Sequence, residues 1–258
     1  MRFFLVFLIL LFSCSDDKCH KNRIQSEYIT RTHDTFFFPI FNPKFNKREN
    51  YPWEKEISKL VAITDEDMRC KGSKLNPSII ENDEIFNDCE GKNHSLPVIN
   101  GKEGVYPILL EILNYIQYKT KKRVVVTSGY RCPKHNRYIR ANKRSKHIIG
   151  AAVDFYVKDM ENEYEKIVDL IFNFYKEKKR YSLKKEFLFL QSKNRTDVKI
   201  KPWYNKEIFI KLYLEKEGRN LDNKHRYPYI SIQVRFDLEK GKEVNYSEDR
   251  ANNIYLKW

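Results

Sequence analysis

Apolar residues recur at helical spacing in several segments of this chain. Between residues 106 and 118 they follow one another at intervals of three and four, which predicts an amphipathic helix. Residues 161–176 carry a second such stripe, which we expect to cover one face of a sheet. Two further helices are expected: residues 51–67, opened by Pro52, and residues 133–140, opened by a proline suited to a first helical turn.

Short β-branched and aromatic runs elsewhere predict strands. The runs lie at residues 123–127, 151–156, 187–190, 208–214 and 229–236, and we expect the last strand to be central in the sheet. Residues 76–104 are rich in turn formers and predict loops. The simplest assembly of these elements is an α+β domain, a mainly antiparallel sheet with helices packed on one side.

The N-terminal segment has the pattern of an export signal. Ten apolar residues follow Met1 and Arg2, a length typical of a signal peptide and too short to span a bilayer. Leu-Phe-Ser before Cys14 is similar to a bacterial lipobox, in which the cysteine receives lipid, although Phe12 is bulkier than usual and leaves ordinary cleavage open. We therefore expect a signal peptide at 1–13, a tether at 14–50 and the folded domain at 51–258, anchored to a bacterial envelope membrane.

The net charge alone leaves several classes of binding partner open, and the export signal excludes more of them. The 258 residues carry 49 Lys and Arg against 35 Asp and Glu, a net charge of +14. Such a surface suits nucleic acid, anionic lipid or an acidic wall polymer. Because an exported protein meets wall and membrane first, and because the sequence shows no basic helix or RNA-binding motif, we expect no nucleic-acid partner.

Four cysteines remain after Cys14 in a compartment that can oxidise thiols. They are Cys19, Cys70, Cys89 and Cys132. A disulfide between Cys70 and Cys89 would close a loop of about twenty residues, worth about 3 kcal/mol. None of the four has the C-x-x-C spacing of a structural zinc site.

The strongest candidate for a functional site is the pattern Ser145-x-His147-x-x-Gly150-x-Ala152-x-Asp154. Imidazole and carboxylate are both good ligands for Zn²⁺, and a catalytic zinc typically has three protein ligands and one open position. Asp154 interrupts an apolar strand, where a carboxylate is costly unless a cation or hydrogen bonds offset it. The pattern therefore predicts that His147 and Asp154 share a divalent metal.

Three features of residues 128–154 together carry a resemblance to a known family. They are the turn Ser128-Gly129-Tyr130-Arg131, then Pro133, His135 and Asn136, and then the pattern that ends at Asp154. The combination resembles the zinc D-Ala-D-Ala carboxypeptidases, which share their fold with lysostaphin-type endopeptidases and the hedgehog signalling domain. We interpret His135 as structural rather than as a ligand.

The resemblance assigns roles to five residues. It makes His147 and Asp154 the metal ligands, and Arg131 the group that stabilises the substrate carboxylate or developing oxyanion charge. Ser128 and Ser145 would help to position the substrate. The implied fold is that of the hedgehog and D-Ala-D-Ala metallopeptidases.

The third metal ligand departs from the family pattern. Family members often carry it in a late strand similar to HVDVR, and residues 229–235 place Ser231 at the histidine position and Gln233 at the acid position. A second register matches the family's acid-x-x-His spacing, with Asp222 as general base and His225 as third ligand. We favour the second register, because His225 is the only histidine after Asp154, and keep His94 as a reserve candidate.

The implied activity is zinc-dependent cleavage of peptidoglycan stem peptides, in particular D-alanyl-D-alanine carboxypeptidase activity. Zinc lowers the pKa of bound water towards about 7, and a nearby carboxylate accepts the proton. Two alternatives stay open. One is a member of the fold that has lost catalysis and binds peptidoglycan or a protein partner. The other is a surface lipoprotein that adheres through its basic, aromatic-rich exterior.

Overall fold

The computed structural model describes residues 31–32, 35–36, 60–91, 94–99, 101–194, 196–253 and 255. The chain divides into two units, residues 1–50 and 51–258, and each is described by itself. In the first unit the description covers only strands β1 (Arg31–Thr32) and β2 (Thr35–Phe36), which pair with each other. The expected signal peptide, the lipidated Cys14 and most of the tether lie outside the described residues. Among the described helices, none has the length and apolar character needed to cross a membrane.

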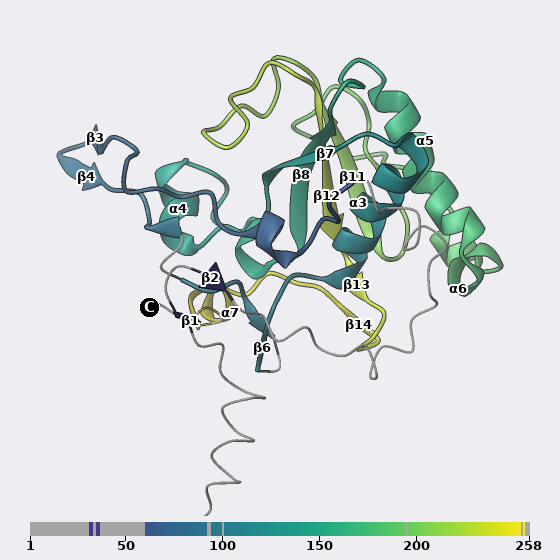
Figure 1. Ribbon diagram of the computed structural model, residues 1–258, viewed down its shortest axis with the longest axis horizontal. Coiled ribbons are helices and arrows are strands. Elements are labelled where there is room, and N and C mark those ends of the chain that lie inside the picture. The colour runs from purple at the N-terminus through teal and green to yellow at the C-terminus, as the bar shows by residue number, and fades with distance from the viewer. Residues whose placement is uncertain are drawn as a thin grey trace, which may run out of the picture. The chain divides into compact units, whose positions relative to one another are not determined.

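The second unit is built on a six-stranded sheet in which every neighbouring pair is antiparallel (Figure 1). In spatial order the strands are β7 (Val124–Ser128), β8 (Ala152–Val157), β12 (Tyr229–Val234), β11 (Ile208–Tyr213), β10 (Trp203–Tyr204) and β9 (Leu190–Gln191). The predicted antiparallel α+β class is confirmed. The last long strand, β12, lies inside the sheet between β8 and β11, as its apolar run predicted.

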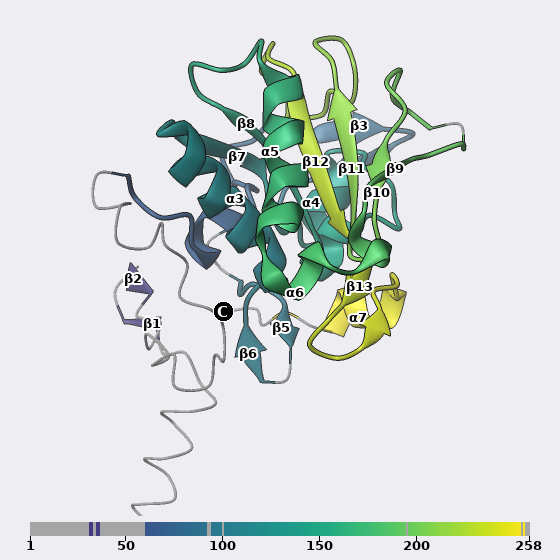
Figure 2. The ribbon, with the colours of Figure 1, turned by 90° about the vertical axis from the view of Figure 1, so that its right-hand side faces the viewer.

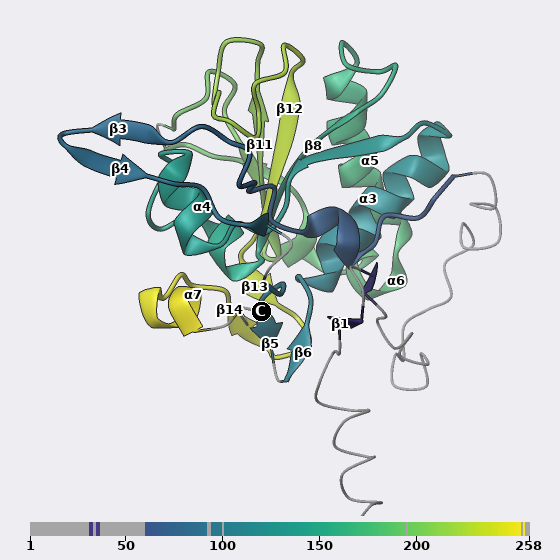
Figure 3. The ribbon, with the colours of Figure 1, turned by 60° about the vertical axis from the view of Figure 1, so that its left-hand side comes forward.

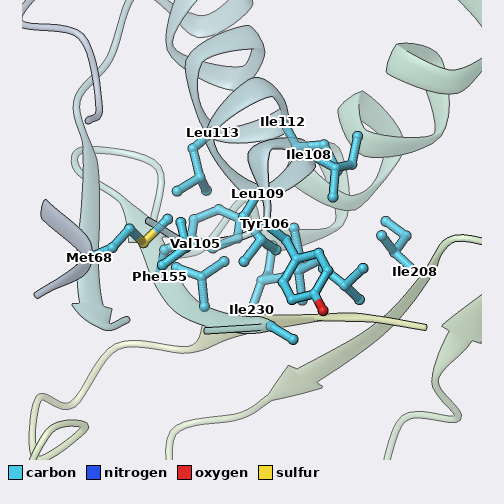
Figure 4. Packing of buried hydrophobic residues seen from close by; sticks show 14 of the residues in the cluster. Met68, Val105, Tyr106, Ile108, Leu109, Ile112, Leu113, Phe155, Ile208 and Ile230 are labelled. Carbon is cyan, nitrogen blue, oxygen red and sulfur yellow. The ribbon is translucent and has the colours of Figure 1, made fainter. Parts of the chain in front are cut away.

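Two long helices cover one face of this sheet (Figure 2). They are α3 (Pro107–Thr120) and α5 (Tyr164–Glu177), both predicted from their apolar spacing, and the short α6 (Lys179–Ser182) follows α5. Side chains of α3 such as Leu109 and Leu113 pack close to Phe155 of β8, as Figure 4 shows. The hydrophobic core therefore lies between the sheet and this helical layer.

The opposite face carries α4 (Pro133–Tyr138), which Figures 1 and 3 place across the sheet from α3 and α5. The segment from β7 to β8 runs through α4 and the 3₁₀ turn η6 (Lys146–Ile149). Small hairpins and one helix complete the unit: β3 (Ile79–Glu81) with β4 (Glu84–Phe86), β5 (Val98–Ile99) with β6 (Lys102–Glu103), β13 (Phe236–Asp237) with β14 (Lys242–Glu243), and α7 (Glu248–Asn253).

One predicted element is wrong, and a second is contradicted in the part that the structure describes. Of the helix expected at 51–67, the described part contains only the 3₁₀ turn η4 (Asp65–Met68), and residues 60–64 are not helical. The strand expected at 187–190 is a 3₁₀ turn, η7 (Lys185–Phe187), and pairing begins only at Leu190. Phe187 is buried because its ring packs against Tyr175 and Tyr181, so an apolar run here reflects an aromatic contact made by a turn.

A buried glutamate fastens α5 to the sheet. Glu207, which precedes β11, is 4% exposed, and its Oε2 accepts a hydrogen bond from the Tyr175 hydroxyl at 2.8 Å. Burial raises the pKa of Glu207 to about 7, although hydrogen bonds from Tyr175 and Tyr181 favour the ionised form. The folded protein therefore binds this proton more tightly than the unfolded chain, and ionising the carboxyl costs stability.

We predict that Glu207→Gln makes the protein less sensitive to rising pH. Because the folded pKa is raised from 4.5 to about 7, the wild type loses stability as pH rises through this window. Across this pH window the free energy of unfolding of the wild type should fall by at most about 3 kcal/mol more than that of Glu207→Gln. Urea unfolding at a series of pH values measures it, with exposed Glu165→Gln as the control. Parallel curves for wild type and Glu207→Gln would contradict the prediction.

Candidate functional site

Asp154 lies on the inner strand β8, with a serine on each neighbouring strand beside it. The β7–β8 register places Ser128 beside it, and the β8–β12 register places Ser231 on the other side. Its neighbours Val153 and Phe155 belong to the hydrophobic core. Since successive side chains of a strand alternate between faces, Asp154 points to the face opposite α3 and α5.

His147 reaches the same face from η6. The turn begins at Ser145, whose Oγ accepts a hydrogen bond from the His147 amide at 3.4 Å, and ends at Gly150 in the left-handed conformation (φ 69°) that glycine adopts without strain. His147 Nδ1 lies 2.7 Å from the Gly129 carbonyl oxygen, so this nitrogen carries a proton. Nε2 then faces Asp154 Oδ1 at 3.2 Å. Ser145 thus shapes the turn that presents His147.

Arg131 lies between two carboxylates. Its terminal nitrogen donates to Asp154 Oδ2 at 3.1 Å, and its Nε lies 3.1 Å from Asp222 Oδ2 and 2.7 Å from Ser128 Oγ. All three charged side chains are at most 5% exposed. In this arrangement one guanidinium forms an ion pair with each of the two aspartates. Its predicted role toward substrate stays a prediction.

Asp222 is bound on both oxygens. Oδ2 accepts hydrogen bonds from Ser128 Oγ at 2.7 Å and from Arg131, and Oδ1 lies 2.9 Å from His135 Nε2. Burial alone would raise the pKa of Asp222, but His135 and Arg131 hold it below its usual range. The carboxylate is ionised at neutral pH, yet its described contacts fix Arg131 and His135. Its predicted role as general base stays a prediction.

His135 joins this network to a third carboxylate. Its Nε2 contacts Asp222 and its Nδ1 lies 2.7 Å from Asp88 Oδ1. Burial alone would lower the pKa of His135, but the two aspartates raise it. Because each ring nitrogen faces a carboxylate oxygen, both carry protons and the ring is a buried cation. The sequence interpretation of His135 as structural agrees with these contacts.

Asp154 has several polar neighbours. Arg131 and the Asn223 side-chain amide both donate to Oδ2, the latter at 2.9 Å, and the Ser231 hydroxyl also bonds the carboxylate. Burial alone would raise the pKa of Asp154, but His147, Arg131 and Ser231 hold it well below its usual range. Asn223, which the sequence analysis missed, is fully buried and is anchored by Thr127 Oγ1 at 2.6 Å.

The structure does not gather the predicted third ligand with the first two. Within the described residues, no set of three His, Cys, Asp or Glu ligand atoms that includes His147 and Asp154 lies within 4.8 Å. Ser231 stands beside Asp154, where the HVDVR alignment placed the missing histidine. His225 lies near the same face but further from Asp154, beside Tyr156 of β8 and Tyr229 of β12. The centroid of its ring is 5.1 Å from that of Tyr156 and 5.7 Å from that of Tyr229.

Two observations nevertheless fit a metal here. The 3.2 Å between His147 Nε2 and Asp154 Oδ1 is close to the edge of about 3.4 Å expected for nitrogen and oxygen on one tetrahedral zinc. Both ring nitrogens of His225 are buried, and no described side chain bonds them. Burial and Arg219 lower the pKa of His225, which favours the neutral, metal-binding form. The residues present thus offer two apposed ligands and one unpartnered donor nearby.

A cleft lies away from these groups. It has a volume of about 670 Å³ and runs between the β3–β4 hairpin, α4 and α7, with Phe86, Tyr138 and Tyr246 among its walls. Neither His147 nor Asp154 lines it, and both are about 95% buried. Substrate access to the pair therefore requires side chains to move.

Comparison with known proteins gives one match. Residues 78–177 match the family described as Peptidase M15, a span of fewer than half of the 258 residues. It includes Arg131, His147 and Asp154 but ends before Asp222 and His225. No curated protein and no solved structure matches the chain. The match supports a relationship between this chain and the M15 peptidases. That family includes zinc D-Ala-D-Ala carboxypeptidases, and its members are typically zinc-dependent.

We predict that Arg131→Met strongly destabilises the fold. The substitution leaves Asp154 and Asp222 buried without the cation that they share, which should cost about 3–5 kcal/mol of unfolding free energy. Arg140→Met is the matched control, because Arg140 pairs with Glu81 at the surface and should cost less than about 1 kcal/mol. Urea denaturation followed by tryptophan fluorescence compares the two, and equal losses would show that the buried cation is dispensable.

Proposed function

We propose that the chain is a zinc-dependent peptidase acting on cell-wall peptides, and specifically a D-alanyl-D-alanine carboxypeptidase. The observation that carries the proposal is the apposition of His147 and Asp154 at metal-chelating distance, inside the segment that matches the M15 peptidases. The antiparallel α+β fold is consistent with that family. The match itself supports a peptidase, and the substrate and the zinc are our inference.

His147, Asp154 and His225 would hold the metal. A bound zinc supplies Lewis acidity and water that ionises near neutral pH. The buried, unpartnered nitrogens of His225 support its inclusion, since a polar group left without a partner in the interior is costly. His225 sits on the loop before β12, so it must approach the His147–Asp154 pair when metal binds.

Arg131 and Asp222 would serve the substrate. The guanidinium is permanently charged and suits the terminal carboxylate of a stem peptide, which would replace one of its two aspartate partners. Asp222 is our proposed proton acceptor on its acid-x-x-His spacing, and it must exchange one present hydrogen bond for water before it can act. Ser128 and Ser145 then act mainly through the groups they hold, Arg131 and the η6 turn.

A second candidate is a protein of the same fold that binds peptidoglycan peptide without cleaving it. Two observations favour it. Ser231 occupies the strand position of the family's histidine, and Asp154 Oδ2 already accepts hydrogen bonds from both Arg131 and Asn223. A carboxylate so satisfied stays buried without a metal. Zinc content and hydrolysis separate the two candidates.

We predict chelator-sensitive release of D-Ala from muropeptides ending in D-Ala-D-Ala by the full chain. His147→Ala/Asp154→Ala should abolish release, because both apposed ligands are lost. His225→Ala should lower zinc affinity and activity together. Mass spectrometry of the muropeptides measures the product, and zinc is counted on the same samples. His33→Ala, outside the described domain, is the control.

The outcomes distinguish the candidates sharply. Muropeptide binding without product, unchanged in His147→Ala/Asp154→Ala, would support the non-hydrolytic protein. Product from the double variant would show that the chemistry lies elsewhere. Product with no effect of His225→Ala would keep the activity and remove His225 from the metal centre.

We further propose that the protein works in the bacterial envelope, exported by residues 1–13 and anchored through a lipid on Cys14. The proposal is supported by the apolar segment before Cys14 and by the wall substrate inferred above. Metabolic labelling with a clickable palmitate analogue should mark the wild type and not Cys14→Ser. Equal labelling, or none in either, would contradict lipidation at Cys14.

A further inference from the structure

Four metal-binding side chains converge away from His147 and Asp154. They are Cys70, Cys89, His94 and Cys132, all buried, and their ligand atoms lie within 4.8 Å of one another. Each comes from a different segment: the loops after η4 and β4, the stretch before β5, and the residue that precedes α4.

The distance between two of the sulfurs fits a shared metal. Cys70 Sγ and Cys89 Sγ are 3.7 Å apart, and Cys70, Cys89 and Cys132 are free thiols. The Cys70–Cys89 disulfide, a pairing that the sequence left open, is therefore absent from the structure. Two sulfurs on one tetrahedral zinc, each about 2.3 Å from it, are about 3.8 Å apart. The observed separation matches that edge.

His94 presents a lone pair that nothing else uses. Its Nδ1 lies 3.0 Å from the Ser95 carbonyl oxygen, and because a carbonyl only accepts, Nδ1 carries the proton. Nε2 is then unprotonated, and it is buried with no hydrogen-bond partner among the described residues. Metal-binding histidines commonly donate their second nitrogen to a backbone carbonyl in this way. His94, our reserve ligand for the other centre, belongs to this cluster.

Backbone amides point at two of the sulfurs. The Gly91 amide lies 3.3 Å from Cys89 Sγ, and the His135 amide lies 3.3 Å from Cys132 Sγ. Such donors stabilise thiolate, the form that binds metal. The backbone also leaves room for the sulfurs, since a Cβ at Gly72 would come within 2.0 Å of Cys89 Sγ.

Aromatic rings flank the cluster. The ring of His94 meets those of Tyr130 and Tyr255 edge-on, at 6.0 Å and 5.5 Å between centroids. Tyr130 is 1% exposed. With solvent held off and four ligands already present, the cluster has no open position for water or substrate, which is the arrangement of structural rather than catalytic zinc.

We propose that Cys70, Cys89, His94 and Cys132 bind a structural zinc ion as a Cys₃His site. Three thiolates and one imidazole suit zinc in both softness and number. The site stands on its own residues and does not depend on the proposed peptidase activity. Sequence spacing hid it, because 18, 4 and 37 residues separate successive ligands.

This zinc would brace the candidate functional site. Cys132 directly follows Arg131, and Cys89 directly follows Asp88, whose carboxylate bonds His135. Fixing the two cysteines therefore fixes one end of the chain Asp88–His135–Asp222 and the turn that carries Arg131. In place of a loop-closing disulfide, one metal would join four segments.

The test is cobalt substitution of the full chain. The protein is purified with a phosphine reductant, stripped with a chelator and titrated with Co²⁺. We expect one thiolate-bound Co²⁺ per chain, seen as a thiolate-to-cobalt charge-transfer band together with intense tetrahedral d–d absorption. Cys89→Ser should reduce the band. His94→Cys should keep the metal and strengthen the band in proportion to four thiolates rather than three.

Two results would overturn the proposal. One is a reduced wild type that shows no charge-transfer band at saturating Co²⁺. The other is native protein without zinc in which mass spectrometry finds Cys70 bonded to Cys89. His94→Cys and the wild-type spectrum decide the matter even if Cys89→Ser fails to fold.

The variants also separate this site from the proposed catalytic one. His147→Ala/Asp154→Ala should leave the charge-transfer band unchanged while abolishing D-Ala release. A chain with the band but without hydrolysis would retain the structural zinc and lose the peptidase proposal. Hydrolysis without the band would do the reverse.

Discussion

The buried carboxylate of Asp154 is the constraint from which the site follows. An ionised group in the middle strands of a sheet is tolerated only when cations and hydrogen bonds replace water around it. Here Arg131, His147, Asn223 and Ser231 supply them. Each comes from a different part of the chain, so the need to satisfy one carboxylate brings β7, η6, the loop before β12 and β12 itself to the same point.

Arg131 extends that requirement outward. A cation placed beside Asp154 also attracts Asp222, which binds His135, which in turn binds Asp88. A buried polar network with unpaired groups is less stable than an apolar core, so each buried charge in this series requires a partner of opposite charge. The series ends beside Cys89, where the cysteine cluster begins. The polar face of the sheet is therefore one connected structure, and the β3–β4 region is held to it by charge as well as by the proposed zinc.

Patterns of apolar residues within short segments predicted much of the fold but less of the candidate functional site. The spacing of α3 and α5, the β-branched run of β7 and the central position of β12 are properties of short segments, and all are confirmed. His147 and Asp154 stood out because a polar pair interrupted an apolar run. Asn223 and the cysteine cluster did not, because their partners are distant in sequence. The strand predicted at Phe187 was wrong because a side chain buried by ring contacts in a turn gives the same apolar pattern as a buried strand residue.

Charge balance bears on the proposed metal site. Asp88, Asp154 and Asp222 are opposed by Arg131 and the doubly protonated His135, which leaves one negative charge in excess. A cation held between His147 Nε2 and Asp154 Oδ1, as in the proposed zinc site, would balance it. Because Ser231 stands where the family has a histidine, the proposed third ligand must come from the loop that carries His225.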